Sequence, residues 1–220
     1  FFAMEVIVIG KIEYEALLPG FIASFIASYT SHFLGLEKFS VNIQQYANVN
    51  DMKHIMLMIL LGIIFGIVGR LFSTALSVSK TFLKDKIKNS YKRIGYVSII
   101  LVIGLMIFKG RYSGLGTNLI ELSFHQNVTV YDWFLKLIFT VITLAIGFQG
   151  GEVTPLFSIG STLGFILAYL FHLPIELCAA LGYAGVFASA TNTLFAPIMI
   201  GLEVFGGSNM FAFIIVCIFA

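Results

Sequence analysis

Long apolar runs that contain almost no charge leave this chain few possible folds. About 20 residues of helix cross the hydrocarbon core of a bilayer, where no water satisfies the backbone. Each run must therefore form a helix that pairs its own peptide groups, which predicts an all-α, polytopic membrane protein. The runs cover residues 1–10, 17–36, 55–78, 94–108, 133–148, 156–173, 175–189, 194–205 and 208–220.

The composition agrees with a chain dissolved mostly in lipid. Apolar residues make up 59% and charged residues 11% of the sequence, whereas a soluble domain has about 45–50% and about 25%. The net charge of +2 provides no broad basic surface, so nucleic acid is not an expected partner. The chain begins with Phe and ends in an apolar run, and we expect it to be part of a longer protein.

Two polar stretches set the predicted orientation in the membrane. Residues 80–93 hold six Lys or Arg residues and one Asp, and short basic loops stay on the cytoplasmic side. We therefore place the 80–93 loop in the cytoplasm, and the polar stretch 37–53 on the other side if 55–78 crosses once. Binding of anionic lipids by the basic residues is an alternative reading.

The segment Gly-Gly-Glu-Val-Thr-Pro at residues 150–155 carries the most chemical information. Pro155 suits the first turn of a helix and Thr154 suits the N-cap. Two glycines before them leave the backbone open to a ligand. Free N–H groups at a helix N-terminus bind anions without a full positive charge. We predict an anion site at Gly151, Glu152, Val153 and Thr154; an ordinary turn at the membrane surface is the competing reading.

Glu152 is unexpected in an anion site, because a carboxylate repels an anion. Three roles stay open for it: a surface residue in water, a hydrogen-bond acceptor that shapes the loop, or a proton carrier that couples protons to transport. Carboxylates inside membranes are costly and often functional.

Two other breaks separate apolar runs. Residues 189–198 place small polar side chains before Pro197, and residues 111–118 form a glycine-rich stretch. We interpret the first mainly as a structural break that could also line a path, and the second as a loop that could border a vestibule. Gly62, Gly66 and Gly69 are spaced for close helix packing, for which ordinary packing is favoured over a dimer face.

Metal and enzyme chemistry have no support in the sequence. Cys178 and Cys217 lie in apolar runs, where packing rather than a disulfide is expected. The four histidines are scattered, and neither a zinc-binding nor a serine-hydrolase pattern is present. We expect no enzyme activity, no metal and no cofactor.

A short internal similarity suggests a repeat. Glu5 and Glu203 each lie beside a Val in an apolar segment that ends at a Gly. Transporters built from repeats place their substrate between paired, interrupted helices. If the repeat is real, the ion site also needs residues outside this chain.

These residues resemble the CLC family of chloride channels and proton-coupled anion antiporters. Residues 151–155 are similar to the family's second-half GxFxP motif, with Val153 in place of the aromatic residue, and Gly160, Leu163 and Gly164 continue the similarity. Residues 113–120 and 193–203 resemble further family segments. The Gly-Glu-Val-Thr-Pro sequence is most similar to the fluoride-exporting branch, CLC-F.

The resemblance implies a CLC-like inverted-repeat fold with tilted and broken helices. It implies one transmembrane domain over 1–220, in which 1–80 closes the first repeat and 94–220 forms most of the second. The amides of Glu152 and Val153 would face the central anion site, and Thr154 would help select fluoride. Glu152 and Thr154 are also the candidates for gating or coupling. The family's proton-relay glutamate would fall near Ile7, where no acid stands, which also fits the fluoride branch.

The function implied is transport of a small anion, with fluoride efflux coupled to protons as the specific form. A chloride channel or chloride/proton antiporter is the first alternative; a non-transporting subunit or an intramembrane enzyme is a distant one. The expected partners are fluoride or chloride, protons, the lipid bilayer and a second copy in a homodimer. The expected location is a bacterial inner (plasma) membrane. The family's gating glutamate and central tyrosine would lie outside this chain.

Overall fold

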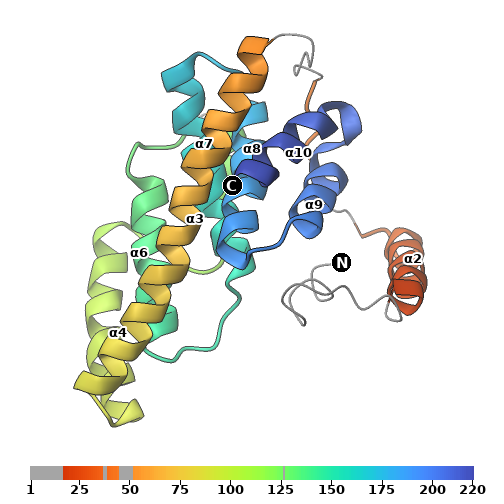
Figure 1. The fold of residues 1–220 in the computed structure, drawn as a ribbon. Helices are drawn as coiled ribbons and strands as arrows, with labels where there is room; N and C mark the ends of the chain where they lie inside the picture. The colour runs from red at the N-terminus through yellow and green to blue at the C-terminus, as the bar shows by residue number, and fades with distance from the viewer. Residues whose placement is uncertain (1–16, 37–38, 45–51, 126) are drawn as a thin grey trace.

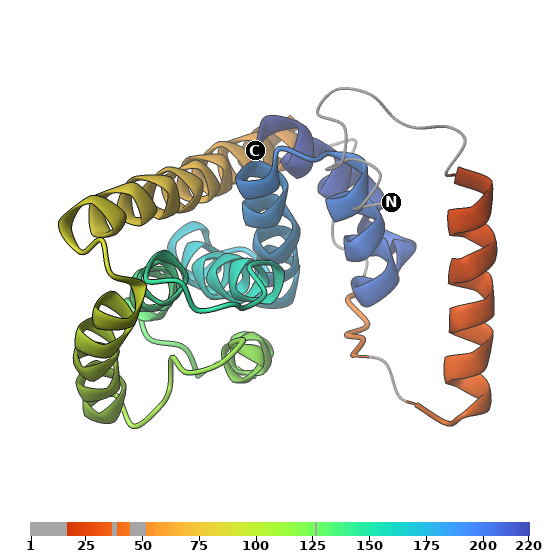
Figure 2. The same ribbon diagram turned by 90° about the horizontal axis from the view of Figure 1, so that it is seen from below.

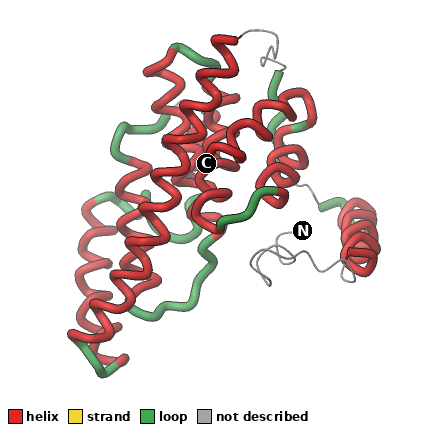
Figure 3. The backbone as a smooth tube through the Cα atoms, in the orientation of Figure 1, coloured by secondary structure: helices red, strands yellow, loops and turns green. Residues whose placement is uncertain are grey.

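The computed structural model describes residues 17–36, 39–44, 52–125 and 127–220. Every regular element in this part of the chain is a helix, as Figure 3 shows. The predicted helix over 1–10, with Glu5 and Ile7, lies outside the described residues. The elements are α2 (Leu17–Phe33), α3 (Met52–Lys86), α4 (Ser90–Ile107), α5 (Thr117–Phe124), α6 (Asp132–Ala145), α7 (Val153–Phe171), α8 (Ile175–Thr191), α9 (Phe195–Phe205), the 3-10 turn η2 (Gly207–Asn209) and α10 (Met210–Phe219).

The helices α7 and α8 form the centre of the molecule (Figure 1, Figure 2). Residues 177–188 of α8 are all buried. A Cβ atom at Gly160 would overlap the Gly182 carbonyl, and one at Gly164 would overlap the Cys178 carbonyl. Small residues therefore let the two backbones touch, which strengthens van der Waals packing where lipid gives no hydrophobic drive.

The helix α3 crosses the whole molecule and packs on α8 and α10. Its 35 residues correspond to about 52 Å at about 1.5 Å per residue, more than a bilayer core of about 30 Å. A Cβ at Gly62 would contact the Val216 carbonyl, and one at Gly69 the Val186 carbonyl. The glycine stripe thus serves packing inside the chain, as predicted.

The prediction of an aqueous loop over residues 80–93 is wrong in its extent. The helix α3 continues to Lys86, and α4 begins at Ser90. Asn89 caps α4, because its Oδ1 accepts hydrogen bonds from the amides of Tyr91 and Lys92 at 3.0 and 3.3 Å. Lysine is a good helix former, so a basic stretch need not end a helix.

The structure adds one helix that the sequence did not reveal. Residues 111–118 were expected to form a loop, but α5 begins within them at Thr117. Gly116 precedes it with φ 87°, where a side chain would also meet Ser158 and Lys136. At 8 residues, α5 is too short for its apolar pattern to stand out.

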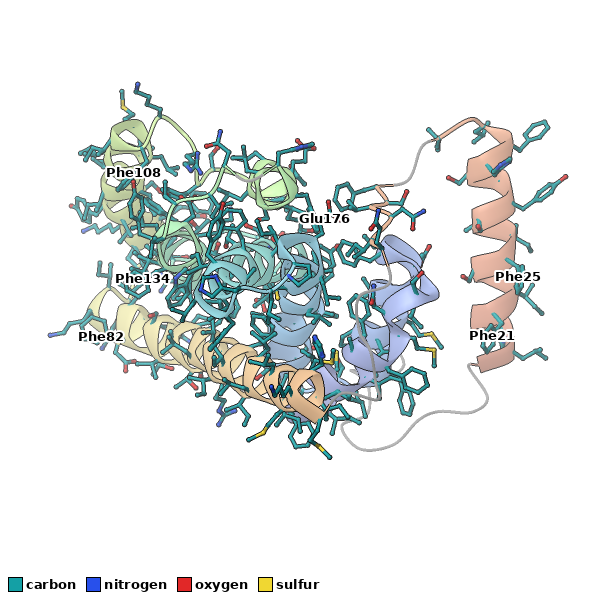
Figure 4. All side chains as sticks on the ribbon, turned by 90° about the horizontal axis from the view of Figure 1, so that it is seen from above. Phe21, Phe25, Phe82, Phe108, Phe134 and Glu176 are labelled. Atoms are coloured by element: carbon teal, nitrogen blue, oxygen red, sulfur yellow. The ribbon has the colours of Figure 1, made fainter. Side chains whose placement is uncertain are left out.

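Apolar side chains cover much of the outside. Phe21 and Phe25 are 47% and 76% exposed on α2, which stands apart from the other helices (Figure 2, Figure 4). Three helices in the described residues are long and apolar enough to cross a membrane: α3, α4 and α7. The shorter α8, α9 and α10 fit the prediction of broken helices.

A buried ion pair ties the segment before α5 to the start of α6. Arg111 Nε and Nη2 donate to the two Asp132 carboxylate oxygens at 3.0 and 2.6 Å, and the Tyr112 hydroxyl donates to Oδ1 at 2.6 Å. The Thr129 amide donates to Oδ2 at 2.8 Å. Burial raises the pKa of the Asp132 carboxyl, but these hydrogen bonds outweigh burial and hold its pKa below the usual value.

Asp132→Asn is expected to lower stability by about 2 kcal/mol, because it removes the charge from a fully buried, hydrogen-bonded carboxylate. A carboxyl group with a lowered pKa stabilises the fold above its unfolded-state value of about 4, and this contribution disappears as pH falls through the folded pKa. Thermal unfolding in detergent across a pH series measures both effects. The exposed Asp85→Asn is the control; equal losses in the two variants at neutral pH would contradict the prediction.

Candidate functional site

The site predicted around residues 151–154 lies at the N-terminus of α7. The helix begins at Val153, and Glu152 occupies the N-cap with φ −89° and ψ −26° but forms no side-chain cap. The prediction that Thr154 caps the helix is therefore wrong: Thr154 is its second residue. Every N–H in a first helical turn is without an intrahelical partner, so Pro155 fits several first-turn positions and does not fix the boundary.

The backbone donors of this turn are free. In the part of the chain that is described, the amides of residues 150–154 donate no hydrogen bond to another protein group. The first bond of α7 runs from the Leu156 amide to the Glu152 carbonyl at 3.2 Å. Gly150, Gly151 and Glu152 are exposed, whereas everything from Pro155 to Phe165 is buried. The turn thus presents unpaired donors at the positive end of a buried helix.

The side chains and glycines of the turn do not converge on one cavity. Gly150 and Gly151 border a cavity of about 290 Å³, which we call the Lys136 cavity. Glu152 borders one of about 320 Å³ beside α3, the Lys80 cavity. Thr154 borders one of about 270 Å³ beside α5, the Thr154 cavity. The turn therefore divides three openings on different sides of α7.

Glu152 reaches toward α3. Its Oε1 lies 3.5 Å from Lys80 Nζ, and the two side chains are 46% and 48% exposed. An ion pair this open contributes little to stability, at most about 1 kcal/mol. The carboxylate is therefore held loosely and stays in contact with the solvent side of the Lys80 cavity.

The break at residues 189–198 meets Glu152 across this cavity. Thr191 lines the Lys80 cavity, and its Oγ1 lies 2.7 Å from Thr193 Oγ1. Asn192 ends α8 with φ 54°, and α9 begins at Phe195. The Ser189 hydroxyl donates to the Gly66 carbonyl at 2.7 Å. The segment therefore provides a hydrogen-bond donor for a backbone carbonyl of α3, and it also borders the cavity that Glu152 lines.

Thr154 faces aromatic and polar residues on the opposite side. The Thr154 cavity is also lined by Thr117 and Glu121 of α5. Phe157 and Tyr183 form its apolar wall, with their rings stacked at 3.9 Å between centroids. A hydroxyl and a carboxylate thus stand near the first turn of α7 in an otherwise apolar pocket.

Lys136, a cation that is only 1% exposed on α6, was not among the predicted site residues. It lines the cavity bordered by Gly150 and Gly151. The one signal available was a single lysine inside the apolar run 133–148, since ionisable residues in such runs mark functional sites. Gly114, from the stretch 111–118, lies in the same cavity.

Two other predicted features have clear positions. Cys178 and Cys217 are free and buried, as predicted for packing. Glu203, from the apolar segment of the suggested repeat, is exposed on α9. Within the described residues, no three His, Cys, Asp or Glu side chains are grouped to hold a metal ion.

Comparisons with known proteins indicate the family to which the chain belongs. The voltage gated chloride channel family matches residues 1–220. A chloride/fluoride channel protein of Pseudomonas syringae pv. tomato (strain ATCC BAA-871 / DC3000) is 37% identical over 212 residues, which are 93% of this chain and 47% of that protein.

A crystal structure of a CLC-type fluoride/proton antiporter matches with a TM-score of 0.95 and 53% identity, over 100% of this chain and 56% of that chain. The chain thus spans about half the length of the relatives it matches. The matches confirm the resemblance and the CLC-like, all-helical fold. The chain belongs to the voltage gated chloride channel family, whose members are integral membrane proteins.

Proposed function

We propose that the protein containing this chain carries small anions across a membrane, with export of fluoride in exchange for protons as its specific form. The observation that carries the proposal is the row of unpaired amides over residues 150–154 at the N-terminus of α7. Anion transport needs a site that binds firmly enough to admit the ion and weakly enough to release it.

Backbone amides meet this requirement better than a fixed cation at the same point. They offer several donors and the partial positive charge of a helix end, which is equivalent to roughly half an elementary charge. The free amides of Glu152 and Val153 are the donors we assign to the anion, together with the Gly151 amide. Among halides, fluoride is the smallest and the strongest hydrogen-bond acceptor, so a cluster of N–H donors suits it.

We assign proton coupling to Glu152. Its carboxylate is half-exposed, is only loosely paired with Lys80 and borders the Lys80 cavity. It belongs to the same turn as the anion-binding amides, so protonation would remove a negative charge next to the anion. This electrostatic link is the physical basis for exchange.

The relatives support fluoride and leave chloride as the second candidate. One is described as a fluoride/proton antiporter and the other as a chloride/fluoride channel protein. A passive channel would need no titrating carboxylate, so the role of Glu152 separates the two.

The remaining assignments extend the proposal to the whole protein. They are two repeat halves, with 1–80 in the first and 94–220 in the second, and a cytoplasmic turn at the basic residues 80–93. They also include a homodimer in a bacterial inner membrane. The three-residue turn between α3 and α4, with its lysines on both sides, supports the orientation through the excess of basic residues on the cytoplasmic side.

The full-length protein in liposomes is expected to release fluoride faster than empty vesicles, as measured with a fluoride electrode. Gly151→Leu should reduce this flux at least about tenfold, because the new side chain covers the free amides of the turn. The side chain has room to do so, since the nearest neighbour of a Cβ atom at Gly151 is Leu115 Cδ2, at 4.0 Å. Gly95→Leu, on the exposed side of α4 with no neighbour within 4 Å, is the size-matched control. Equal flux from Gly151→Leu and Gly95→Leu would exclude the turn as the anion site.

Glu152→Gln should uncouple protons from fluoride, because an amide does not titrate. The proton-to-fluoride ratio, measured from pH and fluoride electrodes in the same vesicles, is expected to fall at least about fivefold. Glu176→Gln at the exposed start of α8 is the control (Figure 4). An unchanged ratio in Glu152→Gln would remove the coupling role and favour a channel.

Thr154→Ala should lower the preference for fluoride over chloride about three- to tenfold, because it removes the one hydroxyl of the turn. Thr81→Ala, at an exposed threonine on α3 whose hydroxyl donates to the Ser77 carbonyl, is the control. Initial rates with each ion give the ratio. If both variants keep the parent's ratio, Thr154 has no part in selection.

A further inference from the structure

Lys136 carries a charge that the proposed function leaves without a role. It lies on α6, is 1% exposed, and is surrounded mostly by apolar residues. Burial of an ammonium group without a counter-charge is strongly unfavourable. Charged residues inside a membrane segment normally pair with another group or mark a functional site.

The protein partners of Lys136 are neutral. Its Nζ donates to the carbonyls of Tyr112 and Gly114 at 3.1 and 2.7 Å. No carboxylate lies within 4 Å of it among the described residues. Two of the three N–H donors of the ammonium are therefore used by carbonyls, and its full positive charge stays unbalanced.

The neighbouring Arg111 shows the contrast. Arg111 lies in the loop that provides the Tyr112 and Gly114 carbonyls, and it is neutralised by Asp132 through two hydrogen bonds. The charge of Arg111 is thus balanced by a carboxylate at the start of α6. Lys136 has no such carboxylate, and instead it faces an opening.

That opening is the Lys136 cavity, of about 290 Å³. Thr140, one helical turn further along α6, lines it together with Lys136. Gly150 and Gly151 form its border toward the free amides of α7, and Ser113 lies at its exposed side. The cavity thus joins a buried cation, polar side chains and the anion-binding turn.

We propose that the Lys136 cavity is a separate binding site for a small inorganic anion, which occupies it before or after the amides of the α7 turn. The inference rests on the proposed anion transport and adds a second site to it. Lys136 supplies the full charge that the turn lacks, at a position where the ion is not yet held by the amides. The charge raises the local concentration of anions.

The size of the cavity defines what it selects. A water molecule takes about 30 Å³ of liquid, so 290 Å³ holds a halide together with several waters. An ion that keeps part of its water is recognised by charge rather than by radius. The site therefore binds fluoride and chloride with similar affinity, and selection falls to the α7 turn.

Two pairs of variants of the full-length protein test the site. Lys136→Gln removes the charge, and Lys136→Arg keeps it. Ser113→Asp places a carboxylate at the exposed side of the cavity without touching the hydrogen bonds of Lys136, and Ser113→Asn is its neutral, isosteric control. Calorimetric titration with sodium fluoride and sodium chloride measures binding in detergent, without transport, and thermal unfolding reports folding.

The parent, Lys136→Arg and Ser113→Asn are expected to bind both ions with similar affinity. Lys136→Gln and Ser113→Asp should weaken this shared binding about tenfold or more, because each removes the net positive charge of the cavity. If Lys136→Gln does not fold, the Ser113 pair decides. Parent-like binding in Ser113→Asp, or in a folded Lys136→Gln, would overturn the proposal and leave Lys136 as a tie for the 112–114 backbone.

Transport separates this proposal from the one on which it rests. A protein that binds anions through Lys136 but releases no fluoride from liposomes would refute the proposed function alone. If the parent protein releases fluoride from liposomes but its anion binding does not change in Lys136→Gln or Ser113→Asp, the second site alone is refuted.

Discussion

Direct contact between the backbones of α7 and α8 holds the centre of the molecule together. Gly160 and Gly182 have no side chain, so the backbone of each lies directly against the carbonyl of the other. Gly164 lies in the same way against the Cys178 carbonyl. A helix seated this closely cannot shift without breaking its packing on every side. The N-terminus of α7 is therefore fixed in space, and its free amides point to a defined place even though the turn before them is exposed.

The chemistry around this fixed end separates charge from selectivity. The amides of residues 150–154 carry partial charge and no net charge, so they can bind and release an anion. The full charges stand one step away, on Lys136 at one side and on the Lys80–Glu152 pair at the other. A fixed cation inside the turn would hold the anion too firmly for rapid release. This arrangement is consistent with a carrier of small, strongly hydrated anions.

Most of the helices could be predicted from the sequence, since apolar runs of this length have few other solutions in lipid. The boundaries that failed have physical reasons: lysines extend α3 into the predicted loop, and Val153 and Thr154 enter α7 ahead of Pro155. The turn itself was visible in its glycines and proline. Lys136 could not be recognised as a site residue from the sequence. Only the folded structure shows that it lines a cavity and has no carboxylate beside it among the described residues. The division of Glu152 and Thr154 between two cavities was equally hidden.

Backbone N–H groups, rather than side chains, are the groups that we assign to the anion. Replacing the Val153 peptide bond with an ester, through the hydroxy-acid counterpart of valine, removes one N–H and leaves every side chain in place. Fluoride titration of the full-length protein with this single change should give an affinity about tenfold weaker, while an ester at the exposed Gly95 should leave it unchanged. An unaltered fluoride affinity with the ester at Val153 would contradict the account.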